Sequence, residues 1–75
     1  RLILAAGAEL VPAAAAVLYA EPDFAAARFA EYAAGSRFTV MEPDGDYGEQ
    51  PVIVDGQRWY RVRAEDGLAG WLVEP

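Results

Sequence analysis

The chain has 75 residues, a hydrophobic fraction of 55% and a formal net charge of −6, with no cysteine and no histidine. One hydrophobic core has to stabilise a single domain of this size, because the sequence supplies neither disulfides nor the ligands of a conventional zinc site. Nucleic acid is not expected as a partner, since the chain is acidic overall and phosphate binding needs a clustered basic face.

The first thirteen residues allow two interpretations. Residues 2–8 are apolar, but they are far fewer than the roughly 20 residues needed to cross a bilayer, so no membrane span is predicted. The segment is either a first strand or an N-terminal extension left by a removed signal or anchor. The strand is favoured, because so small a domain needs each of its apolar segments in the core.

Residues 13–35 combine conflicting signals. Asp23 followed by "FAAARFAEYAAG" predicts a helix on propensity alone, with Asp23 as the N-cap and Gly35 as the C-terminal stop. The alanine run 13–16 also favours a helix, but Pro12 and Pro22 flank it closely.

Three Asp-Gly pairs, at Asp44, Asp55 and Asp66, are spaced eleven residues apart in the second half of the chain. Asp-Gly supplies the positive φ angles of tight hairpins, and turns about 8–12 residues apart are typical of an all-β chain. Strands are therefore expected at residues 36–42, 51–54, 57–64 and 68–73.

The segment 57–64 alternates in a way that predicts one buried and one solvated face. Tyr60 and Val62 fall on one side of such a strand, and Arg61 and Arg63 fall on the other.

The stretch "GQRWYRVRAEDGLAGWL" (56–72) and the earlier "AVLYAEP" (16–22) resemble bacterial SH3-like domains, whose pattern is close to G-x-W-Y-K-V-R followed by D-G-x-x-G-W-V. The resemblance covers roughly residues 14–73. It departs from the family pattern at Tyr19, where an Arg is usual, and in the long loop 43–51. It implies an all-β fold over 1–75, a small SH3-like barrel of five to six short antiparallel strands. Residues 28–33 would then form a strand and the alanine run a wall of the barrel, with a short helical turn at 23–28 as the alternative.

The candidate ligand-binding residues are aromatic: Tyr19, Tyr47, Trp59 and Trp71. In the wider fold, the two Trp positions flank a shallow groove of the kind that binds extended peptides. The alternative, favoured for so short a chain, is that both Trp side chains close one end of the barrel. Tyr47 lies in the turn-forming "PDGDYGEQP" and is expected to be the most exposed of the four.

No catalytic, metal or cofactor site is predicted. Ser36 and Thr39 are the only hydroxyl nucleophiles besides tyrosine, and no His, Cys or Lys is available to act with them. Asp44, Asp46 and Glu49 lack the twelve-residue spacing of a calcium loop, so they are interpreted as a solvated acidic loop.

Arg58, Arg61 and Arg63 suggest a basic stripe along one strand. Cross-strand pairing with neighbours such as Glu42 and Glu65 is the favoured interpretation, since exposed ion pairs of this kind are common and weak. Recognition of a carboxylate-bearing peptide is the alternative, because arginine pairs with carboxylates through two parallel hydrogen bonds.

The resemblance implies a non-enzymatic, extracytoplasmic role. We expect a protein-interaction or assembly module of a larger cell-envelope or secreted protein or complex, with a protein or peptide partner. The alternative is a targeting domain that binds peptidoglycan. Protein contact is ranked first, because no residue pattern is specific for sugars or cross-bridge peptides and the apolar excess suits an interface.

Overall fold

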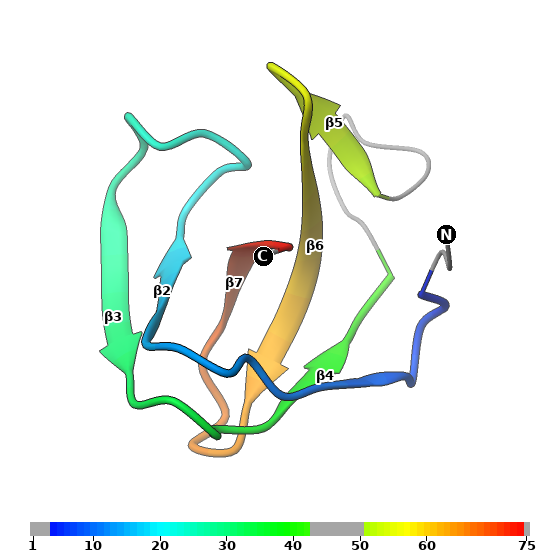
Figure 1. The fold of residues 1–75 in the computed structure, drawn as a ribbon, viewed down its shortest axis with the longest axis vertical. Helices are drawn as coiled ribbons and strands as arrows, with labels where there is room; N and C mark the ends of the chain where they lie inside the picture. Colours follow the sequence, from blue (N-terminus) through cyan, green and yellow to red (C-terminus); the bar gives the residue numbers. More distant parts are fainter. Residues whose placement is uncertain (1–3, 43–50, 75) are drawn as a thin grey trace.

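The computed structural model describes residues 4–42 and 51–74, which form one antiparallel sheet of seven strands and no helix (Figure 1). The strands are β1 (Glu9–Leu10), β2 (Ala16–Tyr19), β3 (Arg28–Tyr32), β4 (Phe38–Val40), β5 (Val52–Val54), β6 (Gln57–Ala64) and β7 (Ala69–Val73). Their order in the sheet is β1-β4-β6-β7-β2-β3, and β5 pairs with β6. The predicted all-β, antiparallel class is confirmed. The predicted number of strands, five to six, is too low.

The longest strand, β6, lies at the centre of this arrangement. Its end around Val62 pairs with β4, its beginning around Trp59 pairs with β5, and β7 runs along its other edge. The turn from β5 to β6 consists of Asp55 and Gly56, which both have positive φ (50° and 78°), as a two-residue hairpin requires. Strands β4, β5, β6 and β7 fall within the expected ranges 36–42, 51–54, 57–64 and 68–73.

The connection from β6 to β7 is a second glycine turn. Gly67 has φ 92°, its N–H donates to the carbonyl of Ala64, and the N–H of Ala64 donates to the carbonyl of Leu68. The pair Asp44-Gly45 lies outside the described residues.

The helix that propensity predicts from Asp23 to Gly35 is wrong. Asp23 does cap a turn, since its Oδ1 accepts from the N–H of Ala25 (2.8 Å) and its carbonyl accepts from the N–H of Ala26 (3.0 Å). The turn is not continued, and β3 pairs with β2 instead. Pairing with a neighbouring strand outweighs local propensity here, because the strand gains hydrogen bonds together with partial burial of Ala30 and Tyr32. Of the alanine run, only Ala16 lies in a strand.

Among the described residues 4–13, only Glu9 and Leu10 form a strand, opposite Thr39 and Phe38 of β4. Leu4 and Ala8 also pack against the core. The N–H of Leu4 donates to the hydroxyl of the buried Tyr60 (3.2 Å).

Both faces of the sheet carry buried side chains. The inner core, on one face, consists of Ala16, Leu18, Phe38, Val40, Tyr60, Val62, Ala64 and Leu72. The aromatic cluster, on the other face, consists of Tyr19, Trp59 and Trp71. Successive residues of β6 alternate between the two, so Tyr60 joins the inner core and Trp59 joins the aromatic cluster. The expected alternation of buried Tyr60 and Val62 with more exposed Arg61 and Arg63 is confirmed.

Candidate functional site

The aromatic cluster brings together three of the four predicted site residues from three strands. Tyr19 of β2 lies opposite Trp71 of β7, and Trp59 of β6 lies opposite Val73. The rings of Tyr19 and Trp59 meet edge to face, with centroids 5.4 Å apart. Tyr47 lies outside the described residues.

The three rings are packed rather than displayed. Tyr19 is 9% exposed, Trp59 1% and Trp71 3%. Such burial is what the packing interpretation of the two Trp residues predicts. A ligand that used this cluster would meet the residues that cover it first.

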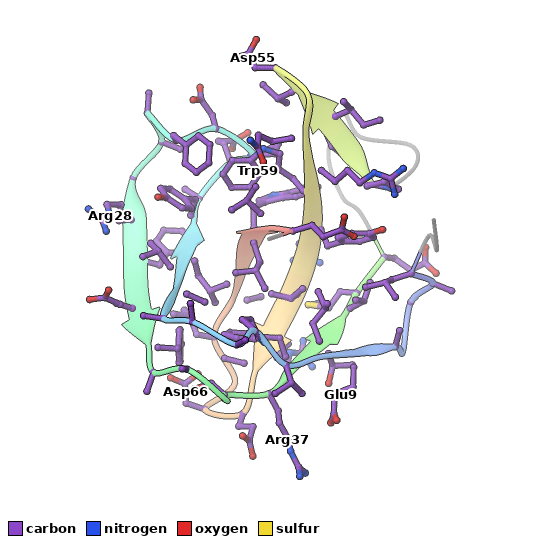
Figure 2. All side chains as sticks on the ribbon, in the orientation of Figure 1. Glu9, Arg28, Arg37, Asp55, Trp59 and Asp66 are labelled. Carbon is purple, nitrogen blue, oxygen red and sulfur yellow. The ribbon has the colours of Figure 1, made fainter. Side chains whose placement is uncertain are left out.

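Phe24 is one of the residues that cover it. This side chain comes from the connection between β2 and β3, and its ring centroid lies 4.9 Å from that of Trp59 and 5.8 Å from that of Tyr19. Phe24 is nevertheless 57% exposed. Figure 2 shows Trp59 at the end of the sheet where the β5–β6 turn with Asp55 lies, far from Asp66 at the other end. The sequence did not identify Phe24 as part of this site. The available signal was its position directly after Pro22 and Asp23, which favour a turn.

An apolar hollow of about 330 Å³ lies beside the cluster. It is lined by residues 12–17 together with Tyr19, Leu72 and Val73, so no charged side chain lines it. Its volume is at the lower end of the roughly 300–1,000 Å³ typical of ligand pockets. Tyr19 belongs to both the hollow and the aromatic cluster, which makes the two features continuous.

The three arginines of β6 do not form one stripe. Arg61 and Arg63 share a face with Trp59, whereas Arg58 shares the other face with Tyr60. Arg61 Nη1 approaches the backbone carbonyl of Glu42 at 3.4 Å. Arg58 Nη1 is buried and has no hydrogen-bond partner among residues 4–42 and 51–74.

No group of three or more potential metal ligands occurs within the described ranges. The Ser36 hydroxyl donates to the carbonyl of Ala33 (2.7 Å) and so serves the turn before β4. None of the described segments is a helix long and apolar enough to cross a membrane.

The surface with the clearest capacity for binding is therefore apolar, and it runs from the hollow over Tyr19 to the exposed ring of Phe24. Comparison of the chain with protein-family models, with curated proteins and with solved structures finds no match.

Proposed function

We propose that this chain is a non-catalytic interaction module that binds a protein or peptide partner through an apolar anchor. The observation that carries the proposal is the hollow of about 330 Å³ beside the aromatic cluster. An aliphatic side chain that enters such a hollow leaves water, which contributes about 1.5–3 kcal/mol when its burial is complete.

The continuity of the surface supports an extended partner. Tyr19 lines the hollow, and its ring contacts Phe24, which is 57% exposed. A peptide anchored in the hollow would thus reach Phe24 across the edge of Tyr19. Grooves that read peptides are built in this way, with aromatic side chains next to a pocket for one anchor residue.

The SH3-like arrangement and the extracytoplasmic setting belong to the same proposal. The pairing of β6 supports the SH3-like arrangement. This strand pairs with β4 and β5 along one edge and with β7 along the other, next to the inner core. The assignment to a larger extracytoplasmic protein or complex rests on the resemblance of residues 56–72 to bacterial SH3-like domains.

The proposal is tested by a substitution that fills the hollow with a larger side chain. Ala14 lines it and is exposed, so Ala14→Phe blocks the anchor position with little effect on the core. Ala6 is exposed and does not line the hollow, so Ala6→Phe is the matched control. Peptides selected from a random display library on the immobilised chain serve as probes, and their binding to each variant is measured by NMR titration.

The expected result is a set of peptides that share an apolar residue and shift the amide signals of residues 13–19, 72 and 73. These peptides should lose affinity for Ala14→Phe and keep it for Ala6→Phe. Peptides that bind both variants equally, or a selection that returns no binder, would contradict the proposal.

Co-sedimentation with purified peptidoglycan sacculi distinguishes peptidoglycan binding from the binding of a protein or peptide partner. Sedimentation of the wild-type chain that Ala14→Phe abolishes would identify the wall as the partner of this surface. The absence of sedimentation would remove peptidoglycan and leave the protein partner.

A further inference from the structure

We infer that two copies of this chain associate through the free edge of β3, antiparallel to each other, with Arg28 of one copy opposite Glu31 of the second copy. The inference uses a different surface from the hollow and does not rest on the proposed function. It follows from the position of β3, from an irregularity in its pairing and from the charges that this irregularity aligns.

β3 is a terminal strand of the sheet. It ends the strand order, and within the described residues only β2 pairs with it. Figure 1 shows no strand beyond it on its outer side. An uncovered edge presents unpaired backbone N–H and C=O groups, which are a template for another strand.

The hydrogen bonds next to β3 show which residues face that edge. The N–H of Ala20 donates to the carbonyl of Ala27 at 2.9 Å. Hydrogen-bonded and non-hydrogen-bonded pairs alternate in an antiparallel ladder, so the next pair, Tyr19 with Arg28, is a non-hydrogen-bonded one. The backbone N–H and C=O of Arg28 therefore turn toward the free edge.

A bulge in β3 brings Glu31 into the same orientation. Tyr19 lies opposite Arg28 and Val17 opposite Glu31, with the register shift between them leaving Phe29 as an extra residue. Tyr19 and Val17 are two positions apart and share a face of the sheet, so Arg28 and Glu31 also share a face although three positions separate them. The ladder alternation gives Glu31 the same outward backbone groups as Arg28.

The two side chains are available to a partner. Arg28 and Glu31 are both exposed, and neither has a side-chain hydrogen bond or ion pair within the described part of the chain. Figure 2 shows Arg28 projecting away from the sheet.

A twofold axis through the bulge makes this edge complementary to itself. Arg28 of each copy then lies opposite Glu31 of the other, which yields two opposite-charge pairs on one face. Registers that place Arg28 opposite its own copy, or Glu31 opposite its own copy, bring like charges together and are disfavoured. The charges thus select one register at an edge that would otherwise pair loosely.

Phe29 supplies an apolar contact at the centre of the pair. Its Cδ2 lies 3.4 Å from the position that a Cβ on Gly70 would occupy, on the side of the sheet where Leu18 lies. Phe29 is 51% exposed. In this register Phe29 of each copy lies opposite Ala30 of the other copy, on the face opposite to the charged pairs.

Charge exchange tests the inference directly. Arg28→Glu and Glu31→Arg each replace two attractive contacts by two repulsive ones, whereas the double variant restores both with exchanged polarity. Arg63→Glu and Glu65→Arg make the same changes of charge at exposed positions away from β3 and serve as matched controls. Sedimentation equilibrium at about 0.15 M salt, where the Debye length is about 8 Å, measures the dimer dissociation constant.

The expected result is a wild-type dimer and a dissociation constant raised about tenfold or more in each single β3 variant. The Arg63→Glu and Glu65→Arg variants should dimerise like the wild type. An equimolar mixture of Arg28→Glu and Glu31→Arg should form a heterodimer, because both of its charge pairs are then attractive. Near-UV circular dichroism confirms that each variant is folded.

A wild-type chain that stays monomeric at about 1 mM would overturn the inference, since its affinity would then be weaker than about −4 kcal/mol. So would single variants that dimerise as tightly as their controls, or a mixture that forms no heterodimer. The mixture and the double variant keep the test decisive where a single variant loses some stability.

Discussion

The hydroxyl of Tyr32 donates to the carboxylate of Asp66, at 2.9 Å from Oδ2 and 3.2 Å from Oδ1, and so ties the edge strand β3 to the turn between β6 and β7. The same carboxylate accepts from the backbone N–H of Leu68 (3.0 Å). The ring of Tyr32 packs edge to face on Phe38 of the inner core, with centroids 5.3 Å apart. One side chain therefore joins the end of β3, the β6–β7 turn and the core.

Tyr32→Phe removes the hydrogen bond and keeps the ring. We expect the free energy of unfolding to fall by about 0.5–1.5 kcal/mol, near the lower limit because the bond is exposed to solvent. Urea denaturation followed by Trp fluorescence measures this change. An unfolding free energy equal to that of the wild type would show that water replaces the bond without loss.

Stability should also fall at high pH. Burial, the hydrogen bond to Asp66 and the negative charge of Asp66 raise the pKa of Tyr32 above its usual value. The folded chain then holds this proton more tightly than the unfolded chain, so the stabilisation is present below the unfolded pKa of about 10 and is lost as pH rises through the folded pKa. Unfolding free energies from about pH 8 to about pH 11 should decline more steeply for the wild type than for Tyr32→Phe. Parallel curves would contradict this assignment.

Phe24→Ala should expose Trp59. Phe24 makes edge contacts with Trp59 and Tyr19, and ring pairs of this kind contribute about 0.5–1.5 kcal/mol each. We expect a loss of stability in that range and a red shift of the Trp emission in the folded state. Phe29→Ala is the control, because Phe29 is similarly exposed (51% against 57%) and makes no ring contact with either Trp in the described structure. Equal emission spectra for the two variants would refute the covering role of Phe24.

Gly70→Ala should destabilise the contact between the neighbouring strands β7 and β2. A Cβ at this position would lie 3.1 Å from both the Cβ of Leu18 and the carbonyl oxygen of Tyr19. Both atoms belong to the paired strand β2 and cannot move far without disturbing it. We therefore expect the free energy of unfolding to fall by about 1–3 kcal/mol. Gly67→Ala provides a contrast, since a Cβ there meets nothing within 4 Å and any loss comes from its φ of 92°. A Gly70→Ala chain as stable as the wild type in urea would show that β2 and β7 separate easily.

Local chemistry was sufficient to predict the second half of the fold. Asp55 and Gly56 form a hairpin turn because residues with positive φ are needed there, and few other pairs adopt it. Tyr60 and Val62 alternate with Arg61 and Arg63 because a strand turns successive side chains to opposite faces. Both signals act over a few residues, so they can be read without knowledge of the partner strands.

Tertiary structure decided the segment from Asp23 to Tyr32. Its composition favours a helix, but only a single hydrogen-bonded turn forms at Asp23. β2 offers it a paired edge and partial burial of Ala30 and Tyr32, which local propensity does not take into account. The bulge at Phe29, which aligns Arg28 with Glu31, exists only through that pairing.

In the candidate site, too, some features could be predicted from the sequence and others depend on tertiary contacts. The sequence alone identified Tyr19, Trp59 and Trp71 as aromatic residues of interest and favoured the packing of both Trp side chains. It did not predict the cover supplied by Phe24 or the hollow beside the cluster. Each of these features joins strands that are distant in the chain, as Tyr19 and Trp71 are. Composition and periodicity therefore determined the strands and turns of the second half of the chain. The surface that can bind a partner was decided only when the sheet brought its distant strands together, because a contact between them leaves no local pattern to read.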